Sequence, residues 1–204
     1  MLVIFDMDGT LSESSTLLAN SINYVRKEIG LEPLPKDIII KEINNPDCNM
    51  PKFFYNLDKI EPIHEKLFSQ YYTNNHNREQ ELFEGAKELL EYLKLNNINI
   101  ALATNAYKKS AIETLKHLGI IDYFDEVVGF DDVKEPKPSP QMLQKILTSL
   151  NKKENETIFV GDSKRDEIAA KRANIKFIDV SKKDSNFLLE YVKPKIEEYF
   201  SIIS

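Results

Sequence analysis

The chain has 204 residues, of which 42% are hydrophobic and 29% are charged, a composition typical of a globular protein. Its net charge of -6 offers no basic surface for nucleic acid or anionic lipid, and its single cysteine excludes an intramolecular disulfide. The sequence contains no apolar run as long as a membrane span and no signal-peptide pattern. We therefore expect a cytoplasmic protein that binds neither nucleic acid nor a membrane.

The first ten residues combine a buried strand with two acidic side chains. Residues 2–5 form an apolar run that is too short for a helix and is typical of a buried strand. Asp6 and Asp8 follow, and side chains two residues apart point the same way in extended backbone. Gly9 then permits a sharp turn. The acids either simply close the strand in a turn, or hold a cation between them, or include one carboxyl group of raised pKa.

The following seventy or so residues are predicted to be helical. Apolar residues recur at helical spacing over residues 11–30, where Gly30 is expected to end the helix. Further helices are expected over residues 50–57 and 60–72, and the polar residues 73–80 have the composition of a linker. No strand is evident after the first one until residue 98. The sequence therefore predicts an all-helical insertion.

Strands and helices alternate along the rest of the chain. Buried strands are predicted over residues 98–103, 126–129, 157–160 and 176–180, with amphipathic helices between them. This alternation is typical of a doubly wound parallel sheet. We expect an α/β protein whose Rossmann-like core comprises residues 1–12 and 83–204, with an inserted all-helical domain of residues 13–82.

Four groups of polar residues follow the predicted strands or lie in a loop between them. They are Asp6 with Asp8, Thr104 with Asn105, Lys137 in the loop Lys-Pro-Ser-Pro, and Asp162 with Ser163 and Asp166. Ligands of open α/β sheets bind beyond the carboxyl ends of the strands, so we expect all four groups around one crevice. Carboxylates suit Mg²⁺, whereas the three histidines are scattered and form no zinc site.

Most of these residues also have an ordinary structural explanation. Asn105 is a natural N-cap for the helix predicted after it, and Ser163 with Asp166 fits a capping box. A lysine in a loop is usually solvated, although the prolines around Lys137 would stiffen its loop. Asp162, at the end of a buried strand, has no such explanation. No P-loop, Gly-x-Gly-x-x-Gly or Gly-x-Ser-x-Gly motif is present.

The motifs Asp-x-Asp-Gly-Thr, Thr-Asn, Lys-Pro-x-Pro and Gly-Asp-Ser-x-x-Asp occur here in a characteristic order and spacing. In this the chain resembles the haloacid dehalogenase-like (HAD) phosphohydrolases over essentially its whole length. It is most similar to the subfamily with a helical cap, which includes phosphoglycolate phosphatase and β-phosphoglucomutase. One departure is Asn174, where a glycine is usual; asparagine tolerates the same left-handed backbone, so no functional loss is expected.

The resemblance implies a Mg²⁺-dependent phosphatase that acts on a small phosphorylated metabolite, with residues 13–82 as its cap domain. Asp6 would be the nucleophile that forms an aspartyl phosphate, and Asp8 the general acid and then the base. Lys137 would neutralise charge on the phosphate and on the nucleophile. An anionic nucleophile needs such neutralisation to approach an anionic phosphate. Whether the protein is a monomer or a homodimer is left open.

The remaining roles that the resemblance implies are binding roles. Phosphoryl oxygens would be bound by Thr104, the backbone N–H of Asn105, and Gly9. The Mg²⁺ ion would be held by Asp6, the backbone carbonyl of Asp8, and Asp162, with Asp166 as a further ligand or as a partner of one.

Other functions fit the sequence less well. A dehalogenase would give Asp8 no leaving group to protonate, and no cap lysine stands out as the Schiff-base residue of a phosphonatase. Sugar phosphomutases of this type usually carry a histidine ten residues after the second Asp, where this chain has Leu18. In a phospho-receiver domain the phosphoacceptor follows a middle strand, and a cap has no role. A non-catalytic phosphate-binding relative would not need the intact acids and Lys137.

The identity of the substrate does not follow from the sequence. We expect the cap to select it, through residues around 30–36 and 44–51. Candidate contacts to an anionic or hydroxylated leaving group are Arg26, Lys36, Lys41, Asn44, Asn45 and Lys52, each of which also reads as an ordinary surface residue.

Overall fold

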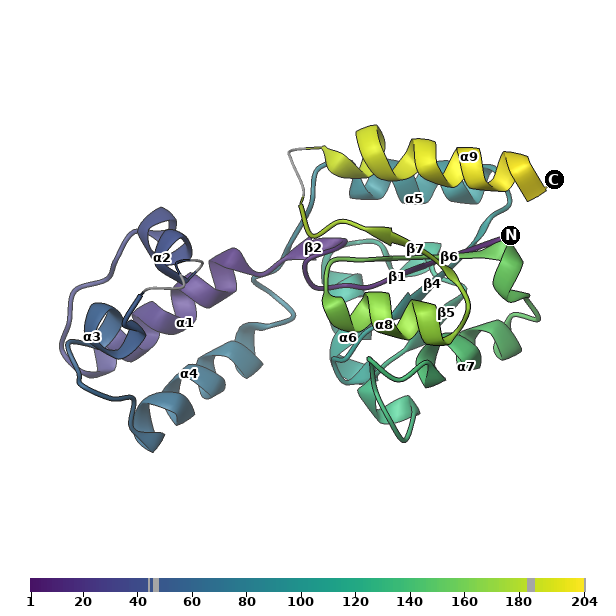
Figure 1. Cartoon of the computed structure of the whole chain (residues 1–204). Helices are drawn as coiled ribbons and strands as arrows, with labels where there is room; N and C mark the ends of the chain where they lie inside the picture. The colour runs from purple at the N-terminus through teal and green to yellow at the C-terminus, as the bar shows by residue number, and fades with distance from the viewer. Residues whose placement is uncertain (44, 46–47, 183–185, 204) are drawn as a thin grey trace. The chain divides into compact units, whose positions relative to one another are not determined.

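The computed structural model describes residues 1–43, 45, 48–182 and 186–203, and the chain divides into two compact units (Figure 1). The larger unit comprises Met1–Glu13 and Glu81–Ser204, and the smaller unit comprises Ser14–Gln80. None of the helices in the described part of the chain is both long and apolar enough to span a bilayer.

A five-stranded parallel sheet forms the centre of the larger unit, with the order β5-β4-β1-β6-β7. Its strands are β1 (Leu2–Phe5), β4 (Asn99–Ala103), β5 (Glu126–Val128), β6 (Thr157–Gly161) and β7 (Lys176–Asp179). Phe5 of the central strand β1 lies opposite Leu102 of β4 and Val160 of β6. The predicted α/β fold with a parallel sheet is confirmed. The strand order reverses beside β1, which is where open α/β proteins bind their ligands.

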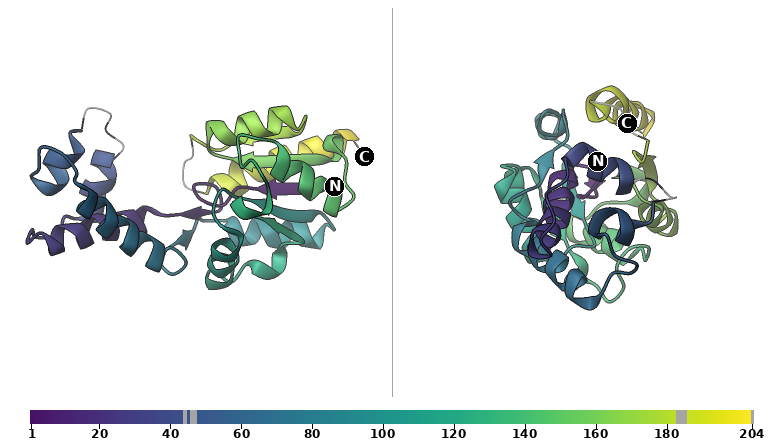
Figure 2. Two further views of the ribbon diagram at one scale, coloured as in Figure 1. Left: turned by 90° about the horizontal axis from the view of Figure 1, so that it is seen from below. Right: turned by 90° about the vertical axis from the view of Figure 1, so that its left-hand side faces the viewer.

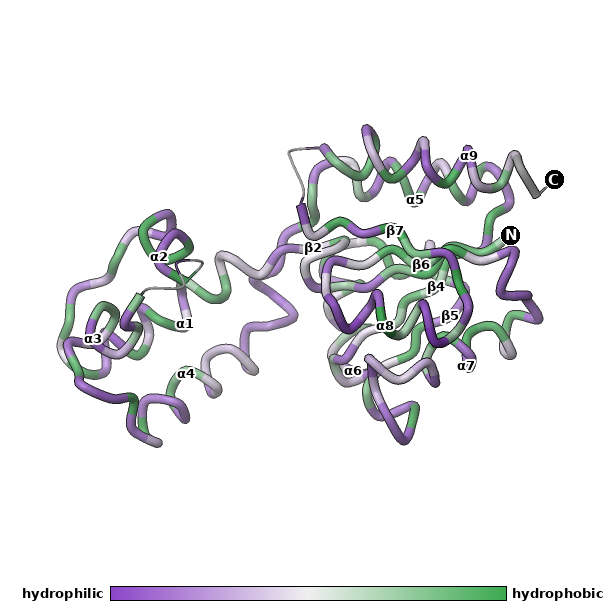
Figure 3. The backbone as a smooth tube through the Cα atoms, viewed as in Figure 1, coloured by the Kyte–Doolittle hydropathy of each residue, from purple (hydrophilic) through white to green (hydrophobic). Residues whose placement is uncertain are grey.

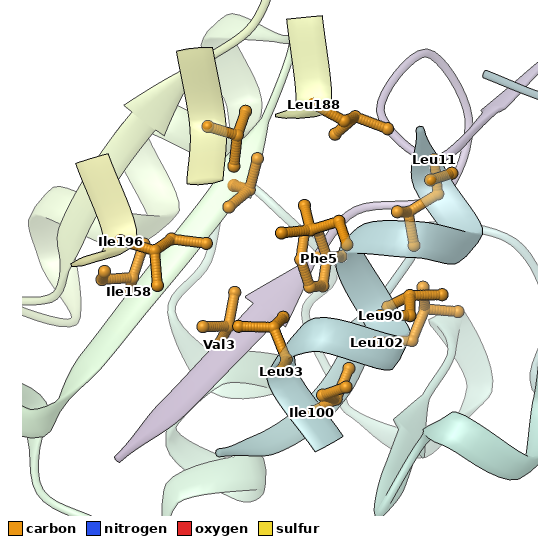
Figure 4. Packing of buried hydrophobic residues seen from close by; sticks show 14 of the residues in the cluster. Val3, Phe5, Leu11, Leu90, Leu93, Ile100, Leu102, Ile158, Leu188 and Ile196 are labelled. Atoms are coloured by element: carbon orange, nitrogen blue, oxygen red, sulfur yellow. The ribbon is translucent and has the colours of Figure 1, made fainter. Parts of the chain in front are cut away.

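Helices cover both faces of this sheet (Figures 1 and 2). They are α5 (Ala86–Leu95), α6 (Lys108–His117), α7 (Gln141–Ser149), α8 (Lys164–Arg172) and α9 (Lys193–Ile203), with shorter helical segments at Ile121–Tyr123, Phe130–Asp132, Glu154–Glu156 and Leu188–Val192. Alternate strand residues point to opposite faces, so Val3 and Phe5 pack with α5, α6 and α9, whereas Leu2 and Ile4 pack with α7 and α8. Figure 4 shows Phe5 within the first of these clusters.

The hydropathy of the chain follows this layered arrangement. Hydrophobic residues run along the sheet strands, whereas hydrophobic and hydrophilic residues alternate along α5 and α9 (Figure 3). Pro194 is the second residue of α9. The helical backbone, however, begins earlier, with the π-helix Leu188–Val192.

Two short strands were not predicted from the sequence. Ser12–Glu13 (β2) and Glu81–Leu82 (β3) pair antiparallel, with Ser12 opposite Leu82 and Glu13 opposite Glu81. The expectation of no strand between the first one and residue 98 is therefore wrong. A strand of two residues is too short to show any periodicity, which explains why the pattern misses it.

The smaller unit contains helices only, within its described residues. They are α1 (Ser15–Glu28), α2 (Lys36–Ile43), α3 (Met50–Tyr55) and α4 (Pro62–Asn75), which enclose a core that includes Ile22, Val25, Ile39 and Phe54. Gly30 follows α1 with φ 78°, as expected for a residue just past a helix end. The predicted linker of residues 73–80 is wrong at its start, because α4 continues through Asn75.

Candidate active site

Asp6 is held at the carboxyl end of β1 by the sheet itself. Its backbone N–H donates to the carbonyl of Val160 at 2.9 Å, which continues the pairing of β1 with β6 by one residue. Met7 is fully buried, whereas Asp8 is half-buried. The N–H groups of Thr10, Leu11 and Ser12 all donate to the Met7 carbonyl, which folds the chain into a tight turn. The strand therefore fixes the position of the Asp6 carboxylate.

Lys137 lies between two carboxylates. Its Nζ is 2.6 Å from Asp6 Oδ1 and 2.6 Å from Asp166 Oδ1, and the residue is only 4% exposed. The ammonium also lies 5.4 Å from the centre of the Phe159 ring. The alternative explanation of Lys137 as a solvated loop residue therefore does not hold.

Burial controls the charge state of this cluster. Loss of water around the carboxyl group raises the pKa of Asp6 to about 7, against the opposing effect of Lys137 and with smaller contributions from Asp166 and Asp8. Burial by itself would lower the pKa of Lys137, but the charges of Asp6 and Asp166 outweigh it and raise that pKa above its ordinary value. From the sequence, the proximity of Asp6 and Asp8 was one reason to expect a raised pKa. In the structure, the largest cause of the raised pKa of Asp6 is burial.

Asp166 uses both of its carboxylate oxygens. Oδ1 accepts from Lys137 Nζ, and Oδ2 accepts from the backbone N–H of Ser163 at 3.1 Å and from its hydroxyl at 2.5 Å. Ser163 Oγ in turn caps α8 by accepting from the N–H of Asp166, so the predicted capping box is confirmed. A β-carbon on Gly161 would lie 2.7 Å from the Asp166 β-carbon, so only glycine lets α8 begin this close to β6.

The carboxylates of this cluster fit a divalent cation. Asp6, Asp162 and Asp166 each present one oxygen, and these three atoms lie within 4.8 Å of one another. Three carboxylate oxygens are the hard donors that Mg²⁺ prefers. Two of the three residues, Asp6 and Asp166, also bind Lys137, so the carboxylate cluster and the lysine are directly connected.

Thr104 and Asn105 follow β4 beside the same cluster. Thr104 is buried, its backbone N–H donates to the Val128 carbonyl at 3.1 Å, and its Oγ1 accepts from the N–H of Ala106 at 3.1 Å. The Asn105 side chain accepts from the N–H of Lys137 at 3.1 Å and donates to the Lys137 carbonyl at 3.0 Å. These bonds tie the strand end to the lysine loop.

The explanation of Asn105 as a helix cap is wrong. Helix α6 begins at Lys108 and its N-cap residue is Tyr107, which makes no side-chain capping bond. Sequence reasoning also missed Arg172, whose Nη1 donates to the Pro138 carbonyl at 3.1 Å. Nothing in the sequence around Arg172 marks it, because it lies on an exposed part of α8.

Six cap residues were singled out from the sequence. Of these, Asn45 donates to Glu42 at 3.0 Å, Lys52 Nζ lies 4.0 Å from Asp58, and Lys41 is exposed. Arg26 is buried and its guanidinium donates to the carbonyls of Glu32 and Phe54, so it is used within its own unit. Lys36 Nζ donates to Thr16 Oγ1 at 2.6 Å. Asn44 lies outside the described residues.

The parallel sheet carries a cluster of three carboxylates and a buried lysine at its carboxyl edge. A family model described as haloacid dehalogenase-like hydrolase matches residues 3–180. The chain therefore belongs to the haloacid dehalogenase-like hydrolases, and the resemblance drawn from its motifs is confirmed.

Several named proteins are similar over most of the chain. The pyrophosphatase PpaX of Halalkalibacterium halodurans is 30% identical over 183 residues, which cover 85% of this chain and 80% of the relative. The phosphoglycolate phosphatase of Yersinia pseudotuberculosis is 33% identical over 178 residues, covering 84% and 76%. Together with the family match, these relatives identify the chain as an enzyme of the phosphatase type.

Solved structures agree on the fold. A HAD-superfamily hydrolase of subfamily IA from Geobacter sulfurreducens superposes with a TM-score of 0.70 at 22% identity, covering 87% of this chain and 85% of the other. A Thermotoga maritima protein named as a candidate β-phosphoglucomutase reaches a TM-score of 0.71 at 29% identity, covering 93% and 91%.

Proposed function

We propose that the chain is a Mg²⁺-dependent phosphatase that hydrolyses a small phosphorylated metabolite through a phosphoryl group bound covalently to Asp6. The observation that carries this proposal is the Lys137 ammonium, held 2.6 Å from both Asp6 and Asp166. A carboxylate and a phosphate ester repel each other, so the reaction needs a fixed positive charge beside the nucleophile.

The two chemical steps use Asp6 and Asp8. In the first step a carboxylate oxygen of Asp6 bonds to phosphorus, the ester P–O bond breaks, and Asp8 gives a proton to the leaving oxygen. In the second step Asp8 takes a proton from water, the water oxygen bonds to phosphorus, and the bond to Asp6 breaks. Phosphate leaves and both acids return to their starting states.

The residues around these acids would bind the phosphoryl group and a cation. Because Thr104 Oγ1 accepts from the Ala106 N–H, its hydroxyl hydrogen remains to be donated to a phosphoryl oxygen. We assign a further donor to the backbone N–H group of Asn105, whereas the N–H of Gly9 donates to the Ser12 carbonyl at 2.8 Å. Asp6, Asp162 and Asp166 would hold Mg²⁺, together with the Asp8 carbonyl, and a bound cation supplies charge neutralisation and orientation of the phosphate.

We assign substrate selection to the helical unit Ser14–Gln80, because a lid that excludes water and contacts the leaving group suits this reaction. A cavity of about 480 Å³ within that unit has mostly apolar lining residues, including Leu18, Phe54 and Tyr55. Leu18 stands where sugar phosphomutases of this type usually carry a histidine. An apolar side chain there cannot exchange protons, which favours a phosphatase over a mutase.

The test is phosphate release from a panel of phosphorylated metabolites, with Mg²⁺ and with EDTA. We expect metal-dependent turnover by the wild-type protein and loss of turnover in Asp6→Asn. Asp122→Asn, at an exposed position outside the site, serves as the matched control and should retain wild-type activity. A folded wild-type protein that releases phosphate from no compound would contradict the proposal.

A further inference from the structure

We propose that the side chain of Asn105 is a positioning residue that acts through Lys137. It fixes the stretch of backbone from which the lysine ammonium reaches Asp6 and Asp166. This inference rests on the proposed function, in which Lys137 supplies the positive charge beside the nucleophile.

The Asn105 amide is matched to the backbone of one residue. Its Oδ1 accepts from the Lys137 N–H at 3.1 Å and its Nδ2 donates to the Lys137 carbonyl at 3.0 Å. Only an amide side chain carries both an acceptor and a donor in this side-by-side arrangement. An aspartate keeps the acceptor and loses the donor, and an alanine loses both.

Asn105 is itself held on a rigid base. The residue before it, Thr104, donates its N–H to Val128 at the end of β5 at 3.1 Å. The residue after it, Ala106, accepts from the N–H of Phe130 at 2.8 Å. The clamp therefore transmits the position of the sheet to the loop of Lys137.

The loop of Lys137 depends on this clamp. Residues 134–140 contain neither helix nor strand, and the N–H groups of Lys134 and Glu135 at the start of this loop donate to Gln141 Oε1 at 3.2 Å. Ser139 donates its N–H to Pro136 within the loop at 2.9 Å, and Arg172 binds the Pro138 carbonyl. Among the described contacts, those of Asn105 are the ones that hold the backbone of Lys137 itself.

Displacement of this backbone would move the ammonium. Lys137 reaches its two carboxylates through a flexible four-carbon side chain, and both contacts are as short as 2.6 Å. A misplacement of about 1 Å in a catalytic group costs on the order of 100-fold in rate. We expect Asn105→Ala to lower kcat by about 10- to 100-fold while KM changes by less than about 3-fold, because the charge matters most in the transition state.

The matched control is Asn99→Ala. Asn99 lies at the opposite end of the same strand and also donates its Nδ2, to Asp125 at 3.1 Å. Melting temperature, kcat, KM and the exchange rate of the Lys137 backbone amide are measured for both variants. Asn105→Ala should accelerate exchange of that amide and lower kcat, whereas Asn99→Ala should leave both at wild-type values.

Asn105→Asp keeps the shape of the side chain and serves if Asn105→Ala does not fold. It retains the bond to the Lys137 N–H, so its kcat should be lower than that of the wild type. Where Asn105→Ala folds, the kcat of Asn105→Asp should be higher than that of Asn105→Ala. Wild-type kcat in either Asn105 variant overturns the proposal, as does an unchanged Lys137 exchange rate in Asn105→Ala. A wild-type protein without phosphatase activity would refute the proposed function instead, and amide exchange would still decide whether Asn105 holds Lys137.

Discussion

Gly9 lies so close to Asp162 that a β-carbon on Gly9 would collide with the Asp162 carboxylate. The turn after β1 and the end of β6 thus meet at a point where no side chain fits. Gly9 also has φ 83°, a left-handed conformation that strains any other residue. The glycine of the first motif is therefore needed to bring Asp6 and Asp162 into one carboxylate cluster.

Gly9→Ala should abolish metal-dependent phosphatase activity, because the added methyl group displaces Asp162. Gly119→Ala is the matched control: Gly119 has φ 69°, and a β-carbon there would meet nothing within 4 Å. Both variants should lose about 1–2 kcal/mol of stability from backbone strain. Activity and melting temperature are measured for each, and equal activity in the two would contradict the role of the close approach.

Removing the charge of Lys137 and removing the charge of Asp6 should change the free energy of unfolding by different amounts. Lys137→Met leaves Asp6 and Asp166 buried without their cation, so the free energy of unfolding should fall by about 3–5 kcal/mol. Asp6→Asn should lower it less than Lys137→Met does, since burial, which raises the pKa of Asp6 to about 7, disfavours the ionised form of Asp6, and Lys137 keeps Asp166 as a partner.

Both variants are unfolded by denaturant in the presence of EDTA, so that metal binding does not enter the comparison. Both should be inactive as phosphatases. A Lys137→Met protein as stable as Asp6→Asn would show that the ammonium does not stabilise the folded site.

The stability of the helical unit Ser14–Gln80 should depend on Arg26 rather than on its exposed neighbour Lys27. The buried guanidinium donates to the carbonyls of Glu32 and Phe54, and hydrogen bonds from a charged group contribute about 1.5–3 kcal/mol each. Arg26→Met should therefore make Ser14–Gln80 more susceptible to proteolysis, whereas Lys27→Met, at an exposed position, should not. Equal cleavage rates in the two variants would contradict this structural role.

The sheet could be predicted because its strands carry their own signal. The run Leu2–Phe5 and residues 158–160 of β6 are apolar throughout, since a strand of a parallel sheet is buried on both faces. The two-residue strands β2 and β3 carry no such signal. The observed ends of α4 differ from the predicted ones by a few residues. Polar residues continue this helix through Asn75, and polar residues carry no apolar pattern that would mark its end.

The sequence motifs were enough to locate the cluster of site residues. They did not predict which hydrogen bonds these residues make with one another. Asp6 and Lys137 are 131 residues apart, and they were placed together by the rule that ligands bind at strand ends and by the family resemblance. The structural explanation offered for the Asn105 side chain was a helix cap, whereas its partner lies 32 residues away. Local sequence shows which hydrogen bonds a side chain can make, and the fold decides which of them it does make.

Stability of the larger unit should depend on pH through Asp125. Burial by itself would raise the pKa of Asp125, but hydrogen bonds from Lys94 at 2.7 Å, the Ile100 N–H at 2.8 Å and Asn99 outweigh it and lower that pKa. Since the folded pKa lies below the unfolded value of about 3.9, the ionised carboxylate stabilises the fold above that value. This contribution is lost as the pH falls through the folded pKa.

Asp125→Asn should therefore lower the free energy of unfolding at pH 7 by about 1 kcal/mol, and the difference from wild type should shrink as the pH falls from neutral through the folded pKa. Thermal unfolding over this pH range measures the effect, with Asp122→Asn as the control, because Asp122 is exposed on the same segment. A difference between Asp125→Asn and wild type that stays constant with pH would mean that shape, and not the charge of Asp125, stabilises the fold at this position.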